Sequence, residues 1–194
     1  GQRATDCFFQ SIRAAHQDAK AQGIEYPEVD IVAIWAATLQ RLSEAELLTA
    51  PYHGIDLKDL AVQYEVRTNP TWPMPGADAC LGAFRERHLE LGIVSNAQFF
   101  TRDLFPALLG KTTEQFGFSP TLQFYSYQRG WAKPGTYLYE LAASELSSAG
   151  VPACDVLYIG NDMLNDVVAA AQVGFRTALF AGDARSLRLR SDDH

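Results

Sequence analysis

The sequence has few of the features that mark a membrane protein, a zinc protein or a disulfide-stabilised protein. Only three of its 194 residues are cysteines, and Cys7, Cys80 and Cys154 are too far apart to match a metal-ligand spacing. Scattered cysteines in odd number are typical of a reducing compartment, so we expect a cytoplasmic protein. No apolar run is long enough to cross a bilayer, so we expect no membrane partner.

Positive charge is also scarce. The chain has 16 Lys and Arg residues against 23 Asp and Glu residues, which gives a formal net charge of −7. This balance disfavours nucleic acid as a partner, because a polyanion is bound through clustered basic residues. The length and the apolar content of 47% suit one folded domain, or one domain with a small insert. We make no prediction of the oligomeric state.

The first third of the chain lacks any strand pattern. Apolar residues recur at helical spacing, which predicts helices over residues 4–22, 31–42 and 56–66, with a further short helix from Ser43 to Thr49. The Pro-rich segment Asn69–Gly76 then interrupts the pattern. We therefore expect a helical domain over residues 1–70 and a second domain over residues 71–194.

The second domain alternates between the two patterns. We expect helices over residues 77–91, around Phe99–Leu108 and over 137–147, and strands ending at Ser95-Asn96 and over 121–127, 156–159 and 175–180, followed by a polar tail over 185–194. Strands that alternate with helices predict an α/β domain with a parallel sheet. The apolar run Val156–Ile159 suits a strand that is covered on both faces.

An acidic cluster follows the strand at Val156–Ile159. Gly160 permits a tight turn or a close backbone approach. Asp162 and Asp166 are four residues apart, so they share one face if a helix begins at Asp162. Their repulsion would be relieved by a hard divalent cation, above all Mg2+. The alternative is that Asp162 is only an N-cap and Asp166 only a solvated side chain.

Three polar groups fall at the carboxyl ends of predicted strands, where open parallel sheets bind ligands. They are Ser95 with its neighbour Asn96, Lys133 in a loop, and the acidic pair. Together they could hold a phosphoryl group: the carboxylates bind Mg2+, the metal and Lys133 neutralise charge, and Ser95 donates a hydrogen bond. Taken singly, each has a plainer explanation as a turn, a helix cap or a surface loop.

With these motifs the sequence resembles the haloacid dehalogenase-like (HAD) hydrolase superfamily from about Pro73 to Gly182. Ile93–Ala97 is similar to the family's second motif, Lys133-Pro134 to its third and Gly160–Asp166 to its fourth. The resemblance implies a Rossmann-like parallel sheet core with an α-helical cap formed by residues 1–70. It also implies that Ser95 and Asn96 bind the phosphoryl group, that Lys133 steadies it, and that acids of the fourth motif hold Mg2+.

Two positions depart from the family pattern. The first acid of the fourth motif commonly follows the Gly directly, but here Asn161 intervenes, which leaves open whether Asp162 or Asp166 binds the metal directly. The first motif, which supplies the Asp nucleophile, is absent. Asp30 is the only candidate, and we assign it instead as the N-cap of the helix that carries Ile34 and Trp35.

The absent motif has a structural consequence. In the resembled fold its strand lies between the strands that end at Ser95 and Gly160, so these two should be about two spacings apart, roughly 9 to 10 Å, and should not pair. An empty central position leaves backbone groups unsatisfied. We therefore expect that the given chain lacks its natural start and is inactive as given. Direct pairing of the two strands would instead indicate a native protein without a nucleophile.

The resemblance implies a Mg2+-dependent phosphatase that acts on a small phosphorylated metabolite through an aspartyl intermediate. Two alternatives remain open. One is a 2-haloacid dehalogenase, which is metal-independent in this superfamily, although the acidic pair would repel its carboxylate substrate unless a cation is present. The other is a non-catalytic binding protein on the same scaffold, which the missing nucleophile favours.

Overall fold

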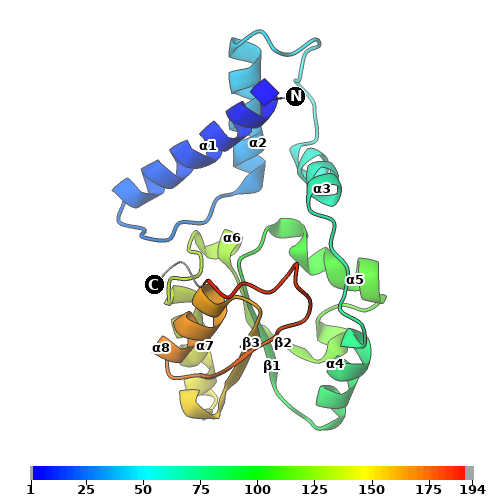
Figure 1. Cartoon of the computed structure of the whole chain (residues 1–194), viewed down its shortest axis with the longest axis vertical. Helices are drawn as coiled ribbons and strands as arrows, with labels where there is room; N and C mark the ends of the chain where they lie inside the picture. Colours follow the sequence, from blue (N-terminus) through cyan, green and yellow to red (C-terminus); the bar gives the residue numbers. More distant parts are fainter. Residues whose placement is uncertain (1, 191–194) are drawn as a thin grey trace. The chain divides into compact units, whose positions relative to one another are not determined.

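The computed structural model of the chain describes residues 2–190, and these divide between Trp72 and Pro73 into two compact units (Figure 1). The division falls inside the Pro-rich segment that the sequence marks as a boundary. None of the described helices combines the length and the apolar character that crossing a membrane requires. The cap role of the first unit stays a prediction.

The first unit contains three helices around a small aromatic core. The helices are α1 (Gln2–Ala21), α2 (Ile31–Glu44) and α3 (Leu57–Thr68). Each contributes one ring to the core, and the centroids of Phe8, Trp35 and Tyr64 lie 4.8 to 5.2 Å apart. Aromatic contacts of this kind each contribute about 0.5–1.5 kcal/mol beyond the area they bury, so the rings join the three helices.

The start of α2 agrees with the sequence, and the segment after its end does not. The carboxylate of Asp30 accepts a hydrogen bond from the Val32 N–H at 2.9 Å, which confirms it as the N-cap. The short helix predicted from Ser43 to Thr49 is wrong. Glu46 has a φ of 55°, and the Leu47 N–H bonds back to the Leu42 carbonyl at 2.9 Å, a turn that ends a helix and prevents its continuation.

The second unit confirms the α/β alternation. Its strands are β1 (Leu91–Ser95), β2 (Phe118–Tyr125), β3 (Leu157–Gly160) and β4 (Arg176–Leu179). Its α-helices are α4 (Ala77–Glu86), α5 (Leu104–Leu109), α6 (Ser126–Arg129), α7 (Tyr137–Ser148) and α8 (Ala169–Gln172). Short 3-10 helices are η1 (Phe99–Asp103), η2 (Glu114–Phe116) and η3 (Ala153–Asp155), and a π-helical segment, η4 (Met163–Val168), precedes α8.

The four strands form two separate parallel pairs instead of one continuous Rossmann-like sheet. β1 pairs with β2, and β3 pairs with β4, with Val94 opposite Phe124 and Ile159 opposite Ala178. The strands that end at Ser95 and Gly160 therefore belong to different sheets. This confirms the prediction that they do not pair directly. The carboxyl ends of both strands lie in the second unit.

The core of the second unit lies on one face of these strands, beneath α7 and α8. Its buried side chains come from β2, α7, α8 and the turn before β4: Leu122, Phe124, Leu138, Tyr139, Ala142, Ala169, Ala170 and Phe175. On β3 only Tyr158 packs against this core, while Leu157 and Ile159 are 57% and 50% exposed. The expectation that β3 is covered on both faces is wrong, because within the described residues helices cover only one of them.

Candidate functional site

The acidic loop after β3 is organised by Asp162. Its carboxylate accepts hydrogen bonds from the N–H groups of Leu164 and Asn165, at 3.1 and 3.0 Å, and so caps the start of η4. The helix that the sequence places from Asp162 onward begins one residue later and is π-helical in its first six residues. Asp162 therefore has the capping role that was one of its two interpretations, and its side chain is buried rather than solvated.

Asp166 lies beside the end of β3 and is buried, with only 4% of its surface exposed. It accepts hydrogen bonds from the Lys133 ammonium at 2.5 Å and from the Asp162 N–H at 3.0 Å. A Cβ atom on Gly160 would collide with the Asp166 carboxylate. The glycine is therefore required here by a close approach, and the prediction that Asp166 is a solvated side chain is excluded.

Lys133 reaches Asp166 from the loop after α6. Its side chain is 10% exposed, and its Nζ atom also lies 3.2 Å from the Tyr158 hydroxyl and 3.4 Å from the Val94 carbonyl. Burial by itself lowers the pKa of Lys133, but Tyr158 and Asp166 raise it by more, and the net shift is upward. Lys133 thus remains an ammonium group in a largely dehydrated position.

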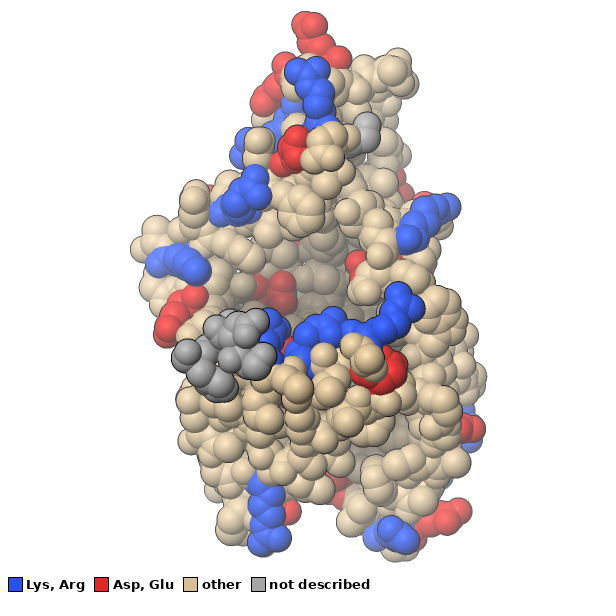
Figure 2. Space-filling model, in the orientation of Figure 1, with Lys and Arg blue, Asp and Glu red and all other residues tan. Residues whose placement is uncertain are grey.

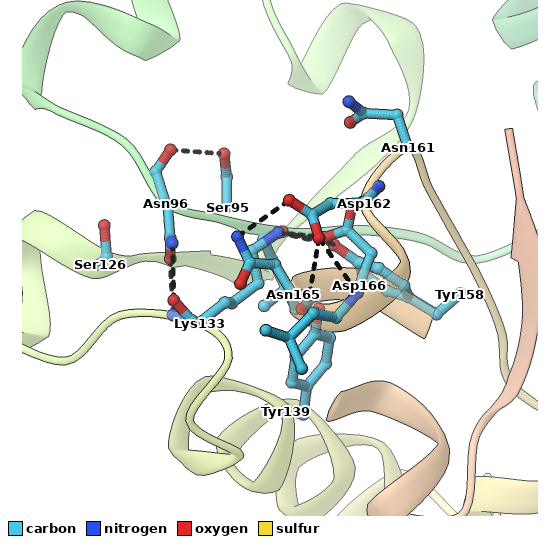
Figure 3. Close-up of polar contacts among 12 residues, drawn as sticks. Ser95, Asn96, Ser126, Lys133, Tyr139, Tyr158, Asn161, Asp162, Asn165 and Asp166 are labelled. Atoms are coloured by element: carbon cyan, nitrogen blue, oxygen red, sulfur yellow. Dashed lines mark hydrogen bonds and ion pairs between the residues drawn. The ribbon is translucent and has the colours of Figure 1, made fainter. Parts of the chain in front are cut away.

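Asn96 fixes the backbone of the Lys133 loop. Its side-chain amide donates to the Lys133 carbonyl at 3.0 Å and accepts from the Lys133 N–H at 2.8 Å. Ser95 ends β1 next to it, with its hydroxyl 3.3 Å from the Asn96 carbonyl. The structure therefore brings Ser95, Asn96, Lys133 and the acidic pair into one cluster (Figure 3).

Sequence reasoning missed two tyrosines of this cluster. The Tyr158 hydroxyl donates to the Val94 carbonyl at 2.9 Å and lies 3.4 Å from Asp166, and burial raises its pKa. The Tyr139 hydroxyl donates to the Asn165 carbonyl at 2.8 Å, and burial raises its pKa as well. A tyrosine in a buried strand or helix face needs a polar partner, and that signal was available in the apolar run around Tyr158.

The third omission is Arg190, which sequence reasoning placed in a polar tail. Its Nε atom lies 3.2 Å from each carboxylate oxygen of Asp162, and its Nη2 atom lies 2.6 Å from Oδ2. Burial by itself raises the pKa of Asp162. The hydrogen bonds from Arg190 and from the loop N–H groups lower the pKa by more, so the net shift is downward. Asp162 is therefore an ionised carboxylate with a protein cation as its partner.

The two carboxylates differ in their capacity to hold a metal. A carboxylate offers about four acceptor positions. Asp162 receives five donor groups: the Leu164 and Asn165 N–H groups, the Asn165 amide, and two nitrogens of Arg190. Asp166 receives Lys133, the Asp162 N–H and the more distant Tyr158 hydroxyl. Asp166 thus fits a hard cation better than Asp162 does, and residues 2–190 contain no group of three or more potential metal-binding His, Cys, Asp or Glu side chains.

Comparison with known families supports the resemblance that the motifs indicate. Residues 130–192 match the HAD-hydrolase-like family model, a stretch that contains Lys133, Asp162 and Asp166. Ser95 and Asn96 lie before the matched residues, so their assignment rests on the geometry described above. A search of curated proteins found no similar sequence.

Proposed function

We propose that the second unit is the phosphoryl-binding core of a HAD-type hydrolase, a phosphatase for a small phosphorylated metabolite. The single observation that carries this proposal is the dehydrated Lys133–Asp166 pair, which lies between the end of β3 and the polar end of β1. A buried ammonium group beside a hydroxyl-bearing strand end suits an anion that carries several oxygens.

Each polar side chain has a distinct part in this proposal. Ser95 donates its hydroxyl to a phosphoryl oxygen, and Asn96 holds the Lys133 loop in register while lining the same site. Lys133 supplies a positive charge that stabilises the negative charge on the phosphoryl group. Asp166 orients the ammonium group and is the acid that best fits Mg2+. When bound, Mg2+ would neutralise phosphoryl oxygens and orient the substrate.

The nucleophile is a separate matter. Both acids of the cluster are engaged, Asp162 with Arg190 and Asp166 with Lys133, so neither suits attack on phosphorus. The proposed aspartyl intermediate needs another carboxylate near Ser95. The nucleophile is therefore not assigned to either acid of this cluster.

Anion binding by the given chain tests this proposal without requiring turnover. Calorimetric titration with orthovanadate should show binding that Ser95→Ala weakens about ten- to one-hundred-fold, because a hydrogen bond to a charged group contributes about 1.5–3 kcal/mol. Ser119→Ala, which alters a half-buried serine on β2, is the matched control and should bind like the unmodified chain. Equal affinities for the Ser95 variant and the control would refute the role of Ser95.

One observation favours a second candidate, the 2-haloacid dehalogenase. The argument against it is that two carboxylates would repel a carboxylate substrate. In the structure both are neutralised by protein cations, Lys133 and Arg190, so no metal is needed for that purpose. Halide release from 2-chloropropionate in the presence of EDTA would favour this candidate. Phosphate release that EDTA abolishes would favour the phosphatase.

A further inference from the structure

The residues after β4 return across the acidic loop and do not form a free tail. We call residues 183–190 the C-terminal strap (red in Figure 1). It begins with a turn in which Asp183 accepts hydrogen bonds from the N–H groups of Arg185 and Ser186, at 2.7 and 2.9 Å. The expectation of a polar tail from residue 185 is therefore wrong for its described part, because backbone and side-chain groups of the loop hold it.

The strap pairs with the loop through its backbone. The Arg188 N–H donates to the Asn161 carbonyl, and the Met163 N–H donates to the Arg188 carbonyl, each at 2.8 Å. These bonds make a parallel bridge between Asp162 and Arg188. The side chain of Asn161 also donates to the Ser186 carbonyl, and Figure 3 shows it directed away from the two carboxylates. The loop is thus held on the side opposite η4.

The C-terminal strap places Arg190 beside Asp162. Arg190 has a φ of 56°, in the left-handed region that non-glycine residues seldom adopt, and its guanidinium contacts both oxygens of the carboxylate. The Asp162 side chain is 10% exposed and the Arg190 side chain 37% exposed, so the pair is only partly hydrated. Figure 2 shows a row of Lys and Arg side chains across the face of this unit where Figure 1 draws the strap.

The cap of η4, Asp162, and the η4 residue Asp166 are two carboxylates close together, and the chain itself provides a positive charge for each. Lys133 neutralises Asp166, and Arg190 neutralises Asp162. A divalent cation at Asp162 would have to displace a guanidinium held by charge-assisted hydrogen bonds, which are about twice as strong as neutral ones. It would also lie beside the displaced positive charge.

We propose that Arg190 is the resident counter-cation of Asp162. It holds the C-terminal strap on the acidic loop and prevents Asp162 from acting as a ligand of a divalent cation. This role of Arg190 does not rest on the proposed function. Arg190 is accordingly a positioning residue, and it acts through Asp162.

Binding of Mn2+, followed by electron paramagnetic resonance, tests the competition directly on the given chain. Arg190→Gln removes the resident cation and two of the five donors on the Asp162 carboxylate, so this variant should bind Mn2+ at least about tenfold more tightly than the unmodified chain. The double variant Arg190→Gln/Asp162→Asn should lose the gain. Arg185→Gln is the matched control on the same strap and should leave the Mn2+ affinity unchanged.

Limited trypsin digestion tests the holding role and uses no metal. Cleavage after Arg188 should be faster in Arg190→Gln than in Arg190→Lys, which keeps a charge, and slowest in the unmodified chain. Near-ultraviolet circular dichroism of each variant establishes that its core is folded; if Arg190→Gln is not folded, the same comparisons are made between Arg190→Lys and the unmodified chain.

The outcomes separate this inference from the proposed function. An unchanged or weaker Mn2+ affinity in Arg190→Gln, or a gain that survives Asp162→Asn, overturns the role of Arg190 as a competitor. Equal cleavage rates overturn its role in holding the strap. If the unmodified chain binds neither Mn2+ nor orthovanadate while Arg190→Gln gains Mn2+ affinity through Asp162, the inference stands and the phosphatase proposal fails.

Discussion

At the scale of single residues, the acidic loop requires that residue 160 has no Cβ atom. The Asp166 carboxylate occupies the space in which a Cβ atom of residue 160 would lie. Gly160→Ala should therefore destabilise the chain by about 1–3 kcal/mol, the usual cost of overpacking a filled site, as measured by urea unfolding. Gly82→Ala in α4 is the control: nothing lies within 4 Å of its added Cβ, so it should be neutral or slightly stabilising. Equal effects of the two variants would contradict the close approach.

The Lys133–Asp166 pair gives a second prediction at this scale. Lys133→Met should destabilise the chain by about 3–5 kcal/mol, because it leaves Asp166 buried without a cation. Adding Asp166→Asn should restore most of that loss, since the uncompensated charge is then gone. A double-mutant cycle in urea measures both effects. Additive losses in the cycle would show that the two side chains do not act as a pair.

Residue roles could be predicted from sequence where the partner is near in the chain. The caps formed by Asp30 and Asp162 bond to N–H groups two or three residues ahead, so local patterns were sufficient. The partners of Tyr158 and Arg190 lie 64 and 28 residues away. A tyrosine in an apolar run signals that it needs a polar partner, but no local periodicity reports which partner Tyr158 or Arg190 contacts.

At the scale of elements, the strap makes stability depend on pH. Because its interactions lower the pKa of Asp162 in the folded chain, its contribution to the free energy of unfolding is complete above the ordinary Asp value of about 3.9. That contribution is lost as the pH falls through the lowered pKa. Arg190→Gln should thus cost about 1–2 kcal/mol at pH 7, a value reduced by the 37% exposure of Arg190.

Below the lowered pKa the unmodified chain and the Arg190 variant should become equally stable. Denaturant unfolding of both proteins over a pH series from 7 down into the range where Asp162 is protonated measures the convergence, with Arg185→Gln as a control that should follow the unmodified chain throughout. A difference that stays constant to the lowest pH would mean that Arg190 stabilises the strap without using the charge of Asp162.

The elements themselves were predicted better than their ends. The helices of the first unit and the order of strands and helices in the second follow from apolar periodicity, and this pattern survives in the structure. β2 begins at Phe118, before the predicted residue 121, because pairing with β1 extends it. The π-helical form of η4 could not be read from the sequence, since no local repeat marks the bond from the Val167 N–H to the Asp162 carbonyl, at 3.2 Å and five residues apart.

At the scale of the whole second unit, the two parallel pairs are joined in part by side chains. The Tyr158 hydroxyl on β3 bonds to the Val94 carbonyl on β1. Tyr158→Phe should cost about 1–3 kcal/mol, because it leaves a partly buried acceptor less well satisfied, and should speed amide exchange at Val94 and Ser95. Tyr127→Phe, which alters a tyrosine outside this connection, is the control. Unchanged exchange in the Tyr158 variant would show that this hydrogen bond does not hold the two pairs together.

The pairing of the strands could be predicted from the sequence in part. Alternation predicted parallel strands, and the missing first motif predicted that β1 and β3 do not pair. The bare face of β3 was not predicted, because an apolar run of four residues reads the same whether one face or both faces are covered. The polar cluster was predicted through Ser95, Asn96, Lys133 and the acids, since all of them follow strand ends.

The strap also sets an order of events during synthesis. Asp162 leaves the ribosome 28 residues before its partner Arg190. A nascent chain that ends within that interval has the loop, the cap of η4 and Lys133, but it cannot bury Asp162 without an uncompensated charge. At that stage β4 can pair with β3, but the Asp162 carboxylate must stay hydrated until Arg190 is synthesised. The ion pair at Asp162 therefore forms only after the acidic loop and the cap of η4 have left the ribosome.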